Sequence, residues 1–547
     1  MRVIRSLAAA AALISVAACD LEVVNPNNPD RGRVLGNPAD VEALSASQFQ
    51  QIQSATLGAI ARVQTGMMTA SFMNASSLAN NGLGPRSGIP RQPVDNSVGN
   101  AYESENFADY RLLSFVARNS ADILARASAP EFRLGSGAAG DLLRLRAWTH
   151  FVYGLSLGYM SMVYDSAGVP KASDPAGSIP GLMGYKDMNV LALAHMDSAV
   201  ALSNGMTALP AGWLTGPGGV EVPAARFAQV ARSYKAVIRA GVARNPAERG
   251  AVDWSAVIAD ANAGITSDLL VRMNPSSGWD VAWLSSTLHF RDANWHQMTY
   301  YIIGMADVSG SFDAWLSTPR DARNPFLIIT PDRRFPQGPT RADQTRSAAA
   351  DDTPLPAGQY FRNRNAGKDQ SGTGWANSWY DHYRFRAFAD ASRIGDFPLL
   401  TKAEVDLLAA EGYLRAGNTT QAAALIDRTR VPAGLPALSG AVSSPTQQVP
   451  GGDQCVPRVP SATGPTQCGN VMEALKWEKR METAYTSYGA WFFDSRGWGD
   501  LVIGTPLYWP VPNQEANARG ISIYNVGGEG REGGATQNTY GYGAGSR

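Results

Sequence analysis

The sequence has few cysteines, few lysines and no net charge. Only three cysteines occur in 547 residues, and only seven of the 47 basic residues are lysines. Asp plus Glu is also 47, so the chain has no global positive field to attract nucleic acid, and we predict no nucleic-acid partner. With 44% hydrophobic and 17% charged residues, 55 Gly and 33 Pro, the composition indicates a globular protein with much loop.

The sequence also lacks the commonest catalytic and cofactor motifs. It has no Walker-type phosphate loop and no His-Glu-x-x-His helix. His289, Asp292 and His296 are close in sequence, but their spacing in an aromatic loop has no defined ligand geometry. We therefore predict no metal site, no cofactor and no catalytic residue.

Residues 1–18 have the organisation of a signal peptide. Arg2 and Arg5 precede an apolar stretch that ends at Ala18 and is too short to cross a bilayer as a stable helix. Small residues lead directly to Cys19, which is typical of a bacterial lipoprotein signal, and more than one acyl chain on such a cysteine gives stable anchoring. The alternative is an ordinary secretory signal followed by an incidental cysteine. We favour lipidation at Cys19, and no later segment could span a membrane.

The two remaining cysteines predict a disulfide. Cys455 and Cys468 are separated by twelve residues in a Pro/Gly/Gln-rich loop, in a chain that its signal peptide places outside the cytoplasm. A metal site is the competing interpretation. No histidine lies within seventy residues before Cys455 and none follows it, so two ligands are too few for a structural zinc.

Apolar residues at steps of three and four predict a helical scaffold. Such stripes cover residues 141–162, which we expect to form a long amphipathic helix, and residues 227–241. A shorter helix follows Asp253, a capping-type residue. Thr401 begins a capping-box pattern, and residues 401–430 predict a tight helical hairpin of the kind that stacks in tetratricopeptide-like arrays.

The remaining stretches suggest a division of the chain into four parts. Residues 266–400 are rich in Gly, Pro, Trp and Arg without a sustained period, so we expect a long irregular segment there. The C-terminal part contains the hairpin, the disulfide loop and a Gly-rich tail from Gly527 that we expect to be mobile. The predicted parts are the signal peptide (1–18), an N-terminal helical region (19–265), the irregular aromatic-rich segment (266–400) and the C-terminal region (401–547).

The irregular segment concentrates aromatic rings beside Arg, Asp and Asn. Pyranose C–H faces stack on such rings while sugar hydroxyls need hydrogen-bond partners, so this composition suits a sugar-binding surface. For any single ring, packing in the core is the favoured interpretation, but we expect one or two rings to line a ligand site. The candidates are Trp279, Trp283, Trp295 and Trp315, with Asn80, Arg86 and Asn96 added by their position in a loop.

Several blocks together resemble the RagB/SusD-like family of outer-membrane lipoproteins, over nearly the whole mature chain. The run Leu-Glu-Val-Val-Asn-Pro-Asn at 21–27 follows Cys19, and residues 143–159 look like the family's Arg-Ala-aromatic helix. One departure from the family pattern is Tyr-Thr-Ser-Tyr-Gly at 485–489, which replaces a more acidic Glu-Gly junction. The most specific blocks follow one another in the family's order at 477–482, 493–499 and 509–515.

Charged residues of these C-terminal blocks predict an ion-pair network rather than a catalytic site. Glu478 and Glu482 lie one helical turn apart, with Arg480 between them, and Asp494 and Arg496 follow in the next block. We assign all five to the scaffold.

The resemblance implies a mostly α, tetratricopeptide-like scaffold of the SusD type, with long irregular loops on its ligand-facing side. It implies a surface-exposed outer-membrane lipoprotein that binds oligosaccharide or peptide nutrients and passes them to a SusC-like TonB-dependent transporter as a hinged lid, without acting as an enzyme. Two alternatives come from other classes. A surface-anchored glycoside hydrolase needs two carboxyl groups about 5–10 Å apart in an aromatic cleft. A structural or adhesion lipoprotein binds only protein.

Overall fold

The structure is a computed structural model and is mostly α-helical. It describes residues 31–76, 83–101, 104–171, 173–175, 178–284, 296–347, 355–364, 378–461 and 464–536. Cys19, Asn80 and Trp295 lie outside the described residues.

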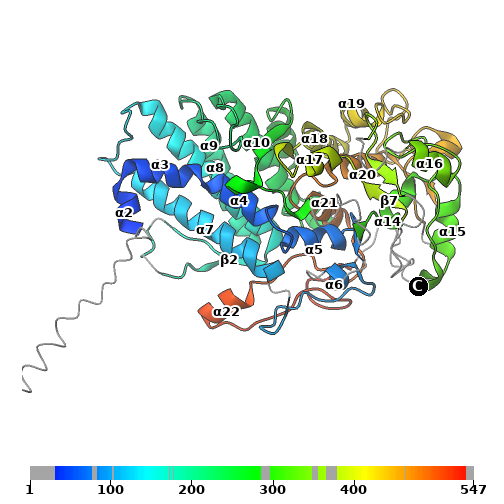
Figure 1. The fold of residues 1–547 in the computed structure, drawn as a ribbon, viewed down its shortest axis with the longest axis horizontal. Helices are drawn as coiled ribbons and strands as arrows, with labels where there is room; N and C mark the ends of the chain where they lie inside the picture. Colours follow the sequence, from blue (N-terminus) through cyan, green and yellow to red (C-terminus); the bar gives the residue numbers. More distant parts are fainter. Residues whose placement is uncertain are drawn as a thin grey trace, which may run out of the picture.

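Long helices pack one against the next in a continuous array, which confirms the predicted fold class. In Figure 1 the N-terminal members of the array occupy the left half of the molecule, and the C-terminal members lie to the right. Successive helices along the array contact one another. The array consists of α7 (Ser104–Ala127), α8 (Ala139–Val163), α9 (Tyr185–Ser203), α10 (Ala224–Gly241), α12 (Trp254–Asn262), α18 (Lys402–Arg415), α19 (Thr419–Arg430) and α20 (Val471–Thr483).

Shorter helices and strands complete the described fold. The helices are α2 (Arg31–Gly36), α3 (Pro38–Ala46), α4 (Gln48–Thr56), α5 (Val63–Ala70), α6 (Leu83–Ser87), α11 (Pro246–Gly250), α14 (Tyr300–Ile303), α15 (Ser311–Ser317), α16 (Arg341–Ser347), α17 (Arg386–Asp390), α21 (Ala490–Trp498) and α22 (Asn513–Arg519). The strands pair antiparallel, as β1 (Ala75–Ser76) with β5 (His296–Gln297), β2 (Ser166–Gly168) with β3 (Leu182–Gly184), β4 (Leu269–Met273) with β8 (Gly395–Leu400), β6 (Phe361–Asn363) with β7 (Tyr380–His382), and β9 (Arg458–Val459) with β10 (Gln467–Cys468).

Helix α8 is more deeply buried than its sequence predicts. The pattern of residues 141–162 indicates one apolar stripe, yet every residue from 151 to 163 is buried. Small residues on the other faces explain the difference, because a Cβ on Gly154 would lie 2.9 Å from the backbone oxygen of Ala192 on α9, and one on Gly158 would meet Ile238 on α10. Neighbouring helices therefore surround α8.

The predicted hairpin and the predicted caps at Thr401 and Asp253 are confirmed. The Thr401 hydroxyl accepts a hydrogen bond from the backbone N–H of Glu404 at 3.1 Å and begins α18. The Asn418 side chain accepts one from the N–H of Gln421 at 3.2 Å and begins α19 directly afterwards. Asp253 caps α12 in the same way. Local capping chemistry thus defines where these helices begin.

A pair of strands brings the two ends of the irregular segment together. Strands β4 and β8 pair antiparallel over residues 269–273 and 395–400, so the chain leaves and re-enters the helical array at adjacent points. Between them the described residues form only short elements. Aromatic stacking stabilises this region, as where the rings of Tyr300 and Phe326 lie 4.1 Å apart.

The C-terminal region confirms one prediction and corrects another. Cys455 and Cys468 form the expected disulfide. The expectation of a mobile tail from Gly527 is wrong for residues 527–536, because Gly528 N–H donates to the Gly504 carbonyl at 2.8 Å and Ala535 N–H to that of Thr505 at 2.9 Å. Backbone hydrogen bonds fasten this part of the tail to residues 504–507.

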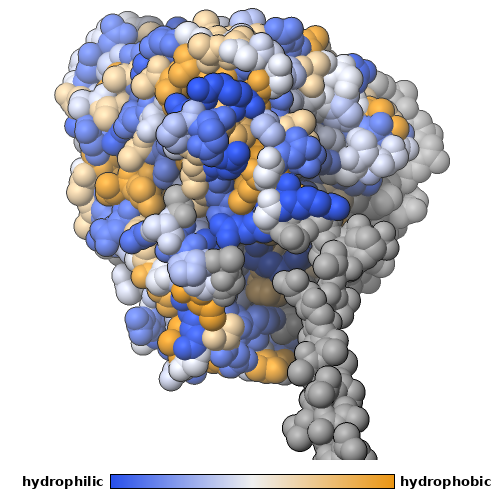
Figure 2. Space-filling view, turned by 90° about the vertical axis from the view of Figure 1, so that its left-hand side faces the viewer, coloured by the Kyte–Doolittle hydropathy of each residue, from blue (hydrophilic) through white to orange (hydrophobic). Residues whose placement is uncertain are grey.

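The outer face of the helical array carries a mixture of side chains. Figure 2 shows the left-hand end of the molecule, where apolar patches lie between polar ones. Phe115 of α7 is 52% exposed. Within the described residues, no helix combines the length and the apolarity that crossing a membrane requires.

Candidate functional site

The two glutamates of the first C-terminal block share one buried arginine. Nη1 of Arg334, from the irregular segment, lies 2.8 Å from Glu478 Oε2 and 3.4 Å from Glu482 Oε1, both on α20. Nη2 of Arg334 lies 2.7 Å from Asp332 Oδ2. All four side chains are buried. The predicted ion-pair network is confirmed here, and it joins α20 to the irregular segment.

A second buried cluster joins four helices around Arg249 of α11. Its Nη2 lies 2.9 Å from Asp494 Oδ1 on α21, and its Nε donates to Glu411 Oε1 on α18 at 2.9 Å. Lys479 Nζ lies 2.8 Å from the other oxygen of Asp494. Burial alone would raise the pKa of Glu411, but the charges of Arg249 and Arg415 bring it well below its usual value. Glu411 is therefore ionised.

The two motif arginines have different partners. Arg480 Nη2 lies 2.6 Å from Asp500 Oδ2, as the ion-pair prediction requires. For Arg496 the prediction is wrong, because its guanidinium donates to backbone carbonyls, including those of Gly241 at 2.7 Å and Leu507 at 2.6 Å. No described carboxylate lies within ion-pair distance of it. Arg496 instead fastens the C-terminal segment to the end of α10.

The described tryptophan candidates lie in the core. Trp283 is 0% exposed, with its ring stacked 5.7 Å from that of Tyr485, and Trp279 and Trp315 are buried as well. Arg323 covers the ring of Trp315, with its Cζ 4.4 Å from the centroid. In the described conformation these rings present no free face to a sugar. Their assignment to a ligand surface stays a prediction, as does that of Trp295 and Asn80.

The described polar candidates are also buried, and they connect two segments. Arg86 Nη1 donates to the carbonyl of Pro93 at 3.3 Å. Asn96 Nδ2 donates to the carbonyl of Val511 at 2.8 Å, and its Oδ1 accepts from the N–H of Asn513 at 3.0 Å. Asn96 therefore joins the predicted ligand loop to the last C-terminal block. A role for either residue in ligand binding stays a prediction.

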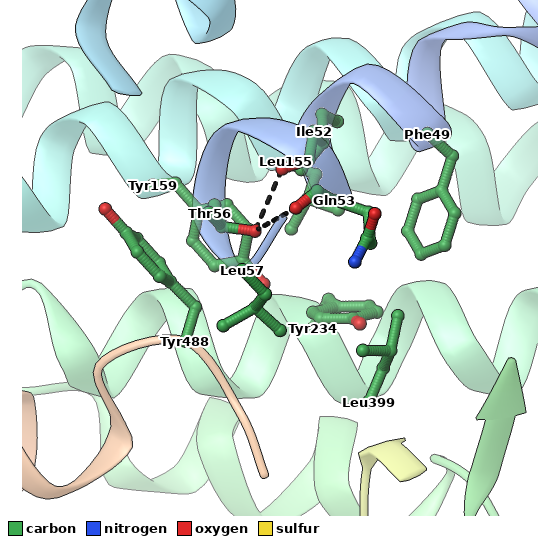
Figure 3. Close-up of a pocket in the computed structure, with 10 residues that line it drawn as sticks. All are labelled: Phe49, Ile52, Gln53, Thr56, Leu57, Leu155, Tyr159, Tyr234, Leu399 and Tyr488. Carbon is green, nitrogen blue, oxygen red and sulfur yellow. Dashed lines mark hydrogen bonds between the residues drawn. The ribbon is translucent and has the colours of Figure 1, made fainter. Parts of the chain in front are cut away.

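The cavity drawn in Figure 3 lies inside the scaffold between α4, α8 and α10. Tyr159, Tyr234 and Tyr488 border it together with aliphatic side chains, and Thr56 on its wall donates to the backbone oxygen of Ile52 at 2.9 Å. Its volume is about 20 Å³, which is room for a water molecule and far too little for a sugar ring. We therefore interpret this cavity as a packing feature.

Metal-ligating side chains do not gather in the described part of the chain. No group of three or more His, Cys, Asp or Glu residues there has the arrangement of a metal site. His150 and His195 face each other across α8 and α9, with their Nδ1 atoms 2.8 Å apart. This contact supplies two nitrogens, whereas a structural zinc site has four ligands.

Solved structures of SusD superfamily proteins share this architecture over most of the chain. One from Bacteroides vulgatus has 12% sequence identity and a TM-score of 0.53, with 88% of this chain and 97% of that chain covered. A SusD-like protein from Bacteroides fragilis has 14% identity and a TM-score of 0.52, with 86% and 88% covered. The chain has the SusD-like fold. A protein of the same superfamily from Bacteroides thetaiotaomicron, 13% identical, gives a TM-score of 0.50 over 84% of this chain and 90% of that one.

These solved structures confirm the SusD-like fold that the C-terminal sequence blocks indicate. At 12–14% identity the likeness concerns the fold and not the ligand. The sequence itself matches no family model and no curated protein.

Sequence reasoning missed the partners of the motif charges. In the fold, Arg334 pairs with Glu478 across 144 positions of sequence, and Arg249 pairs with Asp494 across 245. No periodicity or spacing marks either arginine as a buried cation. Only the packing of the irregular segment on α20 and of α11 on α21 brings these arginines to their partners.

We expect Arg249→Met to destabilise the SusD-like fold by about 3–5 kcal/mol, because it leaves Glu411 buried without its principal cation. Denaturant unfolding followed by circular dichroism measures the change. The matched control is Arg415→Met, since Arg415 pairs with the same Glu411 but is 24% exposed, and it should cost at most about 1 kcal/mol. Equal losses in the two variants would contradict the assignment.

We expect Trp283→Ala to lower the free energy of unfolding by about 3–5 kcal/mol, because it removes a fully buried ring. The same unfolding measurement applies. Phe115→Ala is the control, and at its exposed position the change should stay within about 0.5 kcal/mol. A Trp283→Ala protein that folds with an unchanged free energy of unfolding would show that this ring is not part of the core.

Proposed function

We propose that the chain is a surface-exposed outer-membrane lipoprotein that binds oligosaccharide nutrients, or peptides, and passes them to a SusC-like TonB-dependent transporter, for which it acts as a lid. The observation that carries the proposal is the SusD-like fold, which extends over 88% of this chain in the Bacteroides vulgatus comparison. The C-terminal blocks, which follow one another in the order of the RagB/SusD-like family, and the lipoprotein-type Cys19 support the same proposal.

The ion-pair clusters favour capture over hydrolysis. A glycoside hydrolase needs two carboxyl groups that face a substrate. Glu478, Glu482 and Asp494 are buried and each contacts a cation, so their charges are committed to the scaffold. These carboxylates therefore belong to the scaffold, and we place the ligand at the irregular segment.

We expect the chain from residue 20 onward to bind an oligosaccharide or a peptide and to leave it intact. Calorimetry against plant, algal and microbial oligosaccharides and peptide pools measures binding, and chromatography of the recovered ligand checks for products. Trp295→Ala should weaken the affinity roughly fivefold, because an aromatic ring that stacks on a sugar contributes about 1 kcal/mol.

Phe115→Ala is the control for this screen, since Phe115 is an exposed ring on the distant helix α7. Its affinity for the ligand should equal that of the unchanged protein. Cleavage products would replace the binding role with that of a hydrolase. Absence of binding to every ligand would favour a lipoprotein that contacts only protein.

We expect the full chain to fractionate with the outer membrane of a Gram-negative host and to be reached by protease added to intact cells. Cys19→Ser should abolish metabolic labelling with a fatty acid and release the protein from the membrane fraction, because acylation supplies the anchor. Membrane retention of the unlabelled Cys19→Ser protein would contradict lipid anchoring at this residue.

A further inference from the structure

The five residues 485–489, which connect α20 to α21, form a buried junction. Tyr485 and Gly489 have left-handed backbone conformations, with φ of 61° and 64°. A side chain at Gly489 would clash with the ring of Phe493. A non-glycine residue in this conformation persists only where the surroundings determine it strongly. The contacts of this α20–α21 junction therefore matter for the fold.

Hydrogen bonds from several distant segments converge on the α20–α21 junction. Asn74 donates to the hydroxyl of Tyr485 at 3.0 Å, and the N–H of Gly489 donates to Oε1 of Gln64 at 2.7 Å. Tyr488 donates to Oδ2 of Asp109 on α7 at 2.8 Å. In addition, the Ser487 hydroxyl contacts Glu404 of α18. The junction thus touches both halves of the helical array.

The hydroxyl of Ser487 lies within hydrogen-bond distance of two acceptors but has only one proton to donate. Ser487 has one hydroxyl proton, but the carbonyl of Leu399 lies 3.3 Å from its Oγ and the Glu404 carboxyl is also within hydrogen-bond distance. A hydroxyl donates one hydrogen bond, so an ionised Glu404 would compete with Leu399 for that proton. Both acceptors are satisfied when Glu404 itself carries a proton and donates to Ser487.

The charges around Glu404 do not neutralise it. Glu404 is 2% exposed, and no described cation lies within 4 Å of it. Glu404, Lys479 and Asp494 border a second cavity of about 20 Å³, which is not the one in Figure 3. Lys479 and Asp494 pair with each other at 2.8 Å. A buried carboxylate without its own cation is costly. Burial outweighs the hydrogen bond from Ser487 and the charge of Lys479, so the pKa of Glu404 is raised to about 7.

The other titratable groups on this side are neutral tyrosines and one carboxyl. Tyr159 of α8 and Tyr234 of α10 line the cavity of Figure 3 together with Tyr488, and burial raises the pKa of Tyr159 and of Tyr234. Asp109 lies beyond Tyr488, with Arg62 Nε at 3.9 Å. Burial also raises the pKa of Asp109 to about 7. Glu404 differs from Asp109 because no described cation lies within ion-pair distance to favour its charged form.

We propose that Glu404 is a pH-sensing group of the fold: it is a neutral acid in the folded protein, and loss of its proton as the pH rises weakens the contact between α18 and the α20–α21 junction. The folded state binds the proton more tightly than the unfolded chain, whose glutamate titrates near the ordinary value of 4.5. Stability from this group is therefore full below that value, declines as the pH rises, and is lost above about 7.

The decisive experiment compares the full chain with Glu404→Gln between pH 4.5 and 8. Thermal and denaturant unfolding give the unfolding equilibrium constant at each pH. We expect that constant to rise by on the order of a hundredfold more in the unchanged protein than in the variant, because glutamine does not titrate. The control is Glu221→Gln at an exposed site, which should keep the pH dependence of the unchanged protein. Identical pH dependence in the unchanged protein and Glu404→Gln would overturn the proposal.

Two local measurements complete the test. Hydrogen exchange, corrected for the intrinsic pH effect, should show falling protection of residues 484–493 as the pH rises in the unchanged protein but not in Glu404→Gln. Infrared spectra at pH 6 should show a protonated carboxylic acid that persists in Asp109→Asn and disappears by pH 8.5. If Glu404→Gln does not fold, hydrogen exchange in the unchanged protein decides, and protection of residues 484–493 that stays constant from pH 4.5 to 8 overturns the proposal.

Discussion

Buried ion pairs between distant segments are the constraint on which the assembly of this fold depends. Arg334 brings the irregular segment to Glu478 on α20, and Arg249 connects α11 to Glu411 on α18 and Asp494 on α21. A buried charge without its partner costs several kcal/mol, so these contacts disfavour any arrangement that separates the segments. The helical array and the irregular segment are therefore joined at defined points.

Helix α18 shows how strongly neighbours determine the state of a buried acid. Glu404 and Glu411 lie two helical turns apart, and both are almost completely buried. Glu411 contacts Arg249 and Arg415, so its pKa is lowered, whereas Glu404 has no described cation within ion-pair distance and burial raises its pKa. The same residue type on one helix therefore provides a permanent charge at one position and a titrating group at the other.

The irregular segment achieves order without long secondary structure. Its rings stack on one another and on the rest of the molecule, as where Phe72 and Tyr301 lie 4.6 Å apart. Rigid aromatic packing of this kind positions loops that have few backbone ladders of their own. Trp279, Trp283 and Trp315 are buried in this packing. Rings that stabilise the segment in this way are not free to stack on a ligand.

The sequence by itself determined the features whose signals are local. Apolar periodicity located α8, α10 and α12, the capping box at Thr401 marked the start of the hairpin, and the spacing of two lone cysteines indicated the disulfide. Only the tertiary structure decided that α8 is surrounded, that Arg496 binds carbonyls and that residues 527–536 are packed. It also decided which glutamate receives a cation. These outcomes depend on burial and on contacts between separate elements of the fold, and no local pattern encodes them.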